Sequence, residues 1–114
     1  MAQTPEGKVK QWLYGTAGRE GVLFKYFPGA YVYKPQGGMF GSAGAPDCMM
    51  CWQGIFIGIE IKAVGGKATA LQIKHLKRII EAKGVGALLI GQDEDRLKLI
   101  KQRVMEQIES YRRV

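Results

Sequence analysis

The sequence predicts an α/β domain in which helices flank a mixed central sheet. Residues 69–83 carry apolar side chains at the three- and four-residue spacing of a helix. Residues 55–62 place isoleucine at every second position, as a strand with two different faces does. A continuous apolar run at 85–90 indicates a strand buried on both faces. Alternating strands and helices are characteristic of the α/β class. The 114 residues suffice for one domain, which we place at 1–114.

The N-terminal part predicts a helix followed by two short strands. Thr4 suits the N-cap position, so we expect a helix from Pro5 to about Gly18. Residues 22–27 are rich in aromatic and β-branched side chains and predict a strand, which ends at the Pro-Gly pair that follows. Residues 31–33 predict a further strand fragment.

The middle of the chain predicts a loop, a hairpin and a helix. Residues 36–46 are rich in glycine and predict a loop that either orders on DNA or remains in solvent. Residues 47–62 predict a hairpin with its turn at Gln53-Gly54. Thr69 and Gln72 form a possible capping box for the helix 69–83, whose C′ position suits Gly84. We assign its core face to Leu76, Ile79 and Ile80.

A last helix is expected from residue 93 to about Arg112, because the acids at 93–95 suit the positive end of a helix dipole. Its apolar face consists of Leu97, Ile100, Val104, Ile108 and Tyr111. Leu99 and Met105 lie off this face. They indicate a surface for a partner, although scattered exposed apolar residues are common.

The charge balance favours a polyanionic partner. Lys and Arg total 17 against 10 Asp and Glu, which gives a net charge of +7. No apolar run approaches the roughly 20 residues of a membrane span. The N-terminal residues lack the apolar stretch of a signal peptide, so we expect a cytoplasmic protein that is not secreted.

The two cysteines and the single histidine give weak signals. Cys48 and Cys51 have the spacing of half a zinc site, but the second half is missing, so we expect two reduced, buried thiols. His75 is expected to be a partly exposed helix residue, because a lone histidine is weak evidence for a site.

The predicted hairpin brings two carboxylates together. If Gln53-Gly54 is the turn, Asp47 lies directly opposite Glu60, at about 4.5–5.5 Å between Cβ atoms, and Lys62 follows on the same face. Opposed like charges are destabilising, and Mg²⁺ or Mn²⁺ would resolve the repulsion. The alternatives are a solvated polar end of an edge hairpin, or a register slipped by one residue.

Acids that bind a metal, with a lysine beside them, suit phosphodiester hydrolysis. The metal polarises the phosphate and activates water, while lysine stabilises developing charge. Gly58 on the same face either leaves this face open or permits close packing.

These residues resemble the PD-(D/E)xK nuclease superfamily. Pro46-Asp47 is similar to its PD element, and Glu60-Ile61-Lys62 is similar to its ExK element. With Gly44 before the PD element, a Gly65-Gly66 turn and Gln72 in the next helix, the chain resembles the virus-type replication-repair nuclease family, VRR-NUC, over about residues 5–95.

The resemblance implies an αβββαβ core followed by a C-terminal helix, and DNA cleavage with Mg²⁺ or Mn²⁺. It implies that Asp47, Glu60 and the backbone carbonyl of Ile61 bind the metal and that Lys62 is the catalytic lysine. Gln72 would support the site, although the capping box alone also accounts for it. The acid of the first helix in the family matches Glu6, which otherwise is a helix-dipole acid; Glu20 is the fallback.

Basic residues are spread over the predicted helices. On any one helix a solvated face is the usual explanation, but beside a metal site a phosphate-binding surface accounts for them better. Four lysines are candidates for DNA contacts: Lys25, Lys34, Lys67 and Lys74. No sequence-reading motif or aromatic platform for single strands is evident, so recognition by DNA shape is expected.

We therefore expect a Mg²⁺- or Mn²⁺-dependent deoxyribonuclease that cuts branched DNA, such as a Holliday junction, as a homodimer. Its setting would be a bacterial or a phage-infected cell. The alternative is a non-catalytic DNA-binding or assembly protein on the same fold, against which the intact set of Asp47, Glu60 and Lys62 argues. A basic membrane-surface protein is disfavoured, because no basic amphipathic helix with a large aromatic face is evident.

Overall fold

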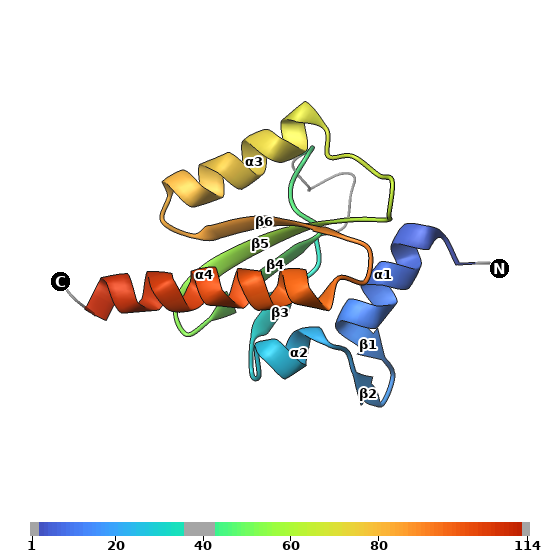
Figure 1. Cartoon of the computed structure of the whole chain (residues 1–114), viewed down its shortest axis with the longest axis horizontal. Helices are drawn as coiled ribbons and strands as arrows, with labels where there is room; N and C mark the ends of the chain where they lie inside the picture. The colour runs from blue at the N-terminus through green and yellow to red at the C-terminus, as the bar shows by residue number, and fades with distance from the viewer. Residues whose placement is uncertain (1–2, 36–42, 113–114) are drawn as a thin grey trace.

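The computed structural model describes residues 3–35 and 43–112. Four helices are present in these ranges: α1 (Pro5–Tyr14), α2 (Leu23–Tyr26), α3 (Ala70–Glu81) and α4 (Glu94–Arg112). The strands of the same ranges are β1 (Gly15–Thr16), β2 (Arg19–Glu20), β3 (Tyr31–Tyr33), β4 (Cys48–Trp52), β5 (Ile55–Lys62) and β6 (Val85–Ile90). The α/β class with a mixed sheet flanked by helices is confirmed (Figure 1).

The main sheet has the strand order β3-β4-β5-β6. Strand β4 runs antiparallel to both β3 and β5. Helix α3 connects β5 to β6, which is parallel to β5. Trp52 pairs with Ile55, and the pairing continues to Cys48 and Ile59. This is the predicted hairpin register, with the turn at Gln53-Gly54.

The two faces of the sheet are covered by different helices (Figure 1). Isoleucines 55, 57, 59 and 61 of β5 point to one face and form the main core with apolar residues of α1, α2 and α4. Helix α3 packs on the other face, where Gly58 and Gly86 lie beneath Ile79 and Leu76. Gly58 therefore serves close packing rather than an open face.

Two N-terminal expectations were wrong. The first helix ends at Tyr14 rather than near Gly18, because Gly15 adopts a φ of 93° and the chain turns into the β1–β2 hairpin. Residues 22–27 contain the short helix α2 rather than a strand. Leu23 and Phe27 are both fully buried, and their four-residue spacing places them on one helical face, which overrides the β propensity of the segment.

Helix α3 has the predicted capping box but a different end and core face. Lys83, not Gly84, has the left-handed backbone (φ 73°) of the C′ position. Its N–H donates to Ile80 O and that of Gly84 to Ile79 O, which is a Schellman motif. Ile80 is 52% exposed and does not belong to the core, because Leu76 and Ile79 already occupy the side that faces the sheet.

The expected loop 36–46 is described only from residue 43, and its first seven residues lie outside the described ranges. In α4, Leu97, Ile100 and Val104 are buried as expected, whereas Tyr111 is 48% exposed. Asp93 caps this helix by accepting a hydrogen bond from Arg96 N. None of the helices described is long and apolar enough to cross a membrane.

We predict that Gly86→Ala lowers the free energy of unfolding by about 2 kcal/mol, whereas Gly58→Ala lowers it by about 1 kcal/mol or less. A Cβ at Gly86 would lie 2.6 Å from the backbone oxygen of Leu76, which cannot move without α3. A Cβ at Gly58 would meet the flexible end of Ile79 at the same distance. Urea denaturation of both variants measures the difference, and equal losses would contradict it.

Candidate functional site

Asp47 is held at the end of the hairpin by a hydrogen bond to β5. It directly precedes β4, and the register of Cys48 with Ile59 places it opposite Glu60. Its Oδ2 accepts a hydrogen bond from the backbone N–H of Ile61 at 2.9 Å. The predicted meeting of Asp47 and Glu60 at this point is thereby supported by a contact between their two segments.

Glu60 is a buried carboxylate that lacks full compensation. Its residue is only 2% exposed, and Lys62 Nζ lies 3.5 Å from its Oε2. Its Oε1 is buried without a hydrogen-bond partner in the described part of the chain. Burial and the negative charge of Asp47 raise the pKa of Glu60 to about 7, against an opposing effect of Lys62.

Helix α1 contributes three side chains to the same region. Lys10 Nζ lies 3.3 Å from Asp47 Oδ1 and 3.3 Å from Glu6 Oε2, so that its ammonium bridges the two acids. Burial lowers the pKa of Lys10, but the carboxylates of Asp47 and Glu6 outweigh this effect and leave it raised. Tyr14 donates a hydrogen bond to Asp47 O at 3.3 Å, and burial raises its pKa.

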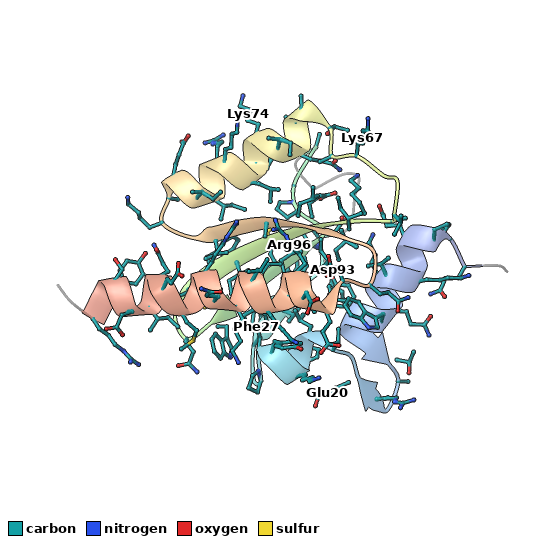
Figure 2. The ribbon with its side chains drawn as sticks, in the orientation of Figure 1. Glu20, Phe27, Lys67, Lys74, Asp93 and Arg96 are labelled. Atoms are coloured by element: carbon teal, nitrogen blue, oxygen red, sulfur yellow. The ribbon has the colours of Figure 1, made fainter. Side chains whose placement is uncertain are left out.

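Lys10 and Tyr14 were missed at the sequence level. Glu6, Lys10 and Tyr14 follow one another at four-residue spacing and therefore share one face of α1. This spacing could have indicated that Lys10 and Tyr14 lie on the same side of the helix as Glu6. Glu6 thus approaches Asp47 only through Lys10. Glu20, the fallback, lies on the β1–β2 hairpin, away from α3 and the sheet (Figure 2).

Gln72 is engaged in the capping box. Its side-chain Oε1 accepts a hydrogen bond from the backbone N–H of Thr69 at 2.8 Å, and its backbone N–H donates to Thr69 Oγ1 at 3.2 Å. The local explanation of this residue is thus confirmed. A supporting role at the acidic site stays a prediction.

The four candidate DNA-binding lysines fall into two regions. Lys34 Nζ lies 4.8 Å from the centre of the Tyr14 ring, beside the acidic site. Lys67 and Lys74 are exposed before and along α3 (Figure 2). Lys25 lies on α2 and pairs with Glu94 Oε2 at 2.9 Å, so that α4 already neutralises it.

The cysteines are unpaired thiols, but only Cys48 is buried. Burial raises its pKa to about 11. Cys51 is exposed, which corrects the expectation of two buried thiols, because three residues along a strand bring it to the opposite face. His75 is partly exposed, as expected, and its Nε2–H donates to Ala43 O at 2.9 Å.

The acidic site offers few ligands, so only an ion such as Mg²⁺, most of whose ligands are waters and substrate oxygens, suits it. Within residues 3–35 and 43–112, no group of three or more His, Cys, Asp or Glu side chains is arranged to hold a metal. Mg²⁺ is commonly bound through one or two carboxylates together with phosphates and waters. Asp47 and Glu60 are the two carboxylates here: Oε1 of Glu60 has no partner in the described residues, whereas the oxygens of Asp47 contact Ile61 N and Lys10 Nζ.

Comparison of the chain with protein-family models, with curated proteins and with solved structures found no match.

We predict that Glu60→Gln flattens the pH dependence of stability in metal-free protein. The folded-state pKa of about 7 exceeds the ordinary value of 4.5, so the folded protein retains a proton that the unfolded chain releases. Stability from this group is therefore present at low pH and is lost as the pH rises from about 4.5 to 7, by on the order of 2–3 kcal/mol.

Urea denaturation in EDTA between pH 5 and pH 8 measures this difference between the wild type and the variant. Asp95→Asn is the matched control, because the Asp95 side chain is 92% exposed. The groups that face Glu60, Asp47 and Lys62, remain in place in both proteins. A Glu60→Gln variant with the wild-type slope would contradict the prediction.

Proposed function

We propose that this protein is a Mg²⁺- or Mn²⁺-dependent endonuclease that hydrolyses phosphodiester bonds in DNA. One observation carries the proposal: Glu60 is a buried carboxylate with an unpartnered oxygen, opposite Asp47 and beside Lys62. Burying an ionised carboxylate without full pairing costs several kcal/mol, and a purely structural strand gains nothing from it. In a site that binds a cation, the same carboxylate gains a ligand for its free oxygen.

Each residue of the site has a distinct role in the proposal. The ion would be held by Asp47, Glu60 and the backbone carbonyl of Ile61, and the Ile61 N–H orients Asp47 for this. When bound, the ion would polarise the scissile phosphate and acidify a water. The ammonium of Lys62, next to Glu60, is suited to orient that water or to neutralise charge that develops on the phosphate.

Lys10 pairs with Asp47. Its ammonium lies 3.3 Å from Asp47 Oδ1 and balances part of the negative charge that Asp47 and Glu60 bring together. The same ammonium also neutralises Glu6. Glu6 would therefore act on the site through Lys10, or join the ligands only after that pair opens.

The order of the elements supports the proposal. Helix α1, strands β3, β4 and β5, helix α3 and strand β6 follow one another as in the αβββαβ core that the resemblance implies. The β1–β2 hairpin and α2 are inserted after α1, and α4 is added at the end. A PD-(D/E)xK core of VRR-NUC type is thus part of the proposal.

The charge distribution supports a DNA substrate. The net charge is +7, although Asp47 and Glu60 gather negative charge at one point. A surface hollow on α3 is lined by three cations, Lys74, Lys77 and Arg78, and by one acid, Glu81. Such a basic surface suits phosphates of a branched duplex without reading its sequence.

We predict that Asp47→Asn, Glu60→Gln and Lys62→Met each lower cleavage at least about 100-fold, because each removes a charge at the reacting phosphate. Cleavage is measured with Mg²⁺ and with Mn²⁺ on duplex, flap and four-way-junction DNA. Binding in EDTA should remain salt-sensitive and near the wild-type strength, and Asp95→Asn is the control.

If the wild-type protein cuts none of these substrates with either ion, the enzyme proposal fails. Retained binding in that case would identify the alternative, a non-catalytic DNA-binding protein.

We further propose that the protein acts as a homodimer, because a domain this small covers little DNA and two strands need two sites. Leu99 and Met105 on α4 are 51% and 47% exposed and supply apolar contact surface. Light scattering at micromolar concentration should give twice the chain mass, and Leu99→Glu or Met105→Glu should lower it. A monomeric wild-type mass would contradict the dimer.

A further inference from the structure

Three exposed aromatic side chains share one face of the sheet. Tyr31 pairs with Cys51, and Cys51 pairs with Phe56, so these three residues form a row across β3, β4 and β5. Directly paired residues point to the same face, and Tyr33 joins them two residues after Tyr31. We call Tyr31, Tyr33, Cys51 and Phe56 the aromatic strip.

The strip is open to solvent because α3 covers only the other half of this face. Tyr31 is 74% exposed, Tyr33 58% and Phe56 45%, and Cys51 is exposed as well. Helix α3 lies over Gly58 of β5 and Gly86 of β6, and it does not extend over β3. Aromatic side chains gathered and exposed in this way mark an interaction surface rather than a core.

The strip and the acidic site belong to the same face. Along β5, Phe56, Gly58, Glu60 and Lys62 alternate with the buried isoleucines and therefore point to one side. Phe56 and Glu60 are four residues apart, which is about 13 Å along a strand. Gly58, which lies between them, is covered by Ile79 and Pro46, so a ligand on the strip would reach Lys62 and the acidic site around this contact rather than along β5.

Basic side chains lie beside the strip at Phe56. This residue lines a surface hollow together with His75, Arg78, Ile79, Ala82 and Gly84, none of which is acidic. Lys34 follows Tyr33 directly and turns to the other face at this edge of the sheet, where its ammonium lies over the Tyr14 ring. Exposed rings beside a cationic group suit a ligand that carries flat apolar groups on an anionic backbone.

We propose that the aromatic strip binds unpaired nucleobases of single-stranded DNA and leads that strand to the carboxylate site. Bases stack on exposed aromatic rings of a sheet, while Lys and Arg contact the phosphates. The inference rests on the proposed nuclease function and deepens it: among branched substrates, it selects those with unpaired nucleotides, such as flaps or splayed arms. It also replaces the sequence-level expectation that no aromatic platform exists.

The test measures binding of a labelled oligo-dT strand and of a blunt duplex of equal length by fluorescence anisotropy in EDTA. The double variant Tyr31→Leu/Tyr33→Leu should bind the single strand at least about tenfold more weakly, since it removes two rings on which bases stack. Duplex affinity should change less than about twofold. Tyr31→Phe/Tyr33→Phe should retain wild-type affinity, because it keeps the rings.

Tyr111→Leu is the matched control, because Tyr111 is a similarly exposed tyrosine on α4. A single-strand reporter provides a second measurement that needs no variant: 2-aminopurine in the strand should be quenched by stacking when wild-type protein binds. Unchanged affinity of the Leu double variant, or unquenched 2-aminopurine in the bound strand, would overturn the proposal. So would a Leu double variant that has lost self-association by light scattering, because the strip would then be an interface between copies.

The two proposals fail separately. If the wild type cleaves DNA but the Leu double variant binds single strands normally, the strip proposal fails and the nuclease proposal stands. If the wild type cleaves nothing but the Leu double variant loses single-strand affinity, the strip proposal stands and the nuclease proposal fails.

Discussion

The hydrogen bond from Ile61 N to Asp47 Oδ2 is the interaction on which the rest of the candidate site depends. The strand β4 begins only at Cys48, so a side chain takes over where the backbone pairing with β5 ends. This bond fixes Asp47 opposite Glu60 and leaves Asp47 Oδ1 for Lys10. Tyr14 secures the same residue from α1 through its backbone oxygen. Without this bond, the two carboxylates would be free to separate.

Local features were readable from the sequence because their causes are local. The hairpin register follows from the Gln53-Gly54 turn, and the capping box follows from Thr69 and Gln72, which are three residues apart. Helix α2 was not readable, because its β-rich composition is overridden by burial of Leu23 and Phe27 against distant elements. The end of α3 was misplaced by one residue, because glycine preference is statistical and Lys83 adopts the left-handed conformation instead.

In the candidate site, too, local features were predictable from the sequence and long-range packing was not. The pairing of Asp47 with Glu60 depends on one hairpin and was predictable, whereas the approach of Lys10 and Tyr14 depends on how α1 packs against β5. The aromatic strip combines β3, β4 and β5, and Tyr31 and Phe56 are 25 residues apart in the sequence. No local pattern connects such residues. Only the sheet register places them in one row.

The position of β5 between two partners has a consequence for how the molecule opens. Strand β5 is bonded to β4 on one side and to β6 on the other, whereas β3 is a three-residue strand at the sheet edge. Local unfolding begins where few bonds must break, so amide hydrogens of β3 exchange with solvent long before those of Ile57 or Ile59, which are paired on both sides. Glu60 directly follows this doubly paired stretch, which opens last. Tyr31 and Tyr33 sit on the part that opens first, so this surface can adapt to a bound molecule while Glu60 keeps its place.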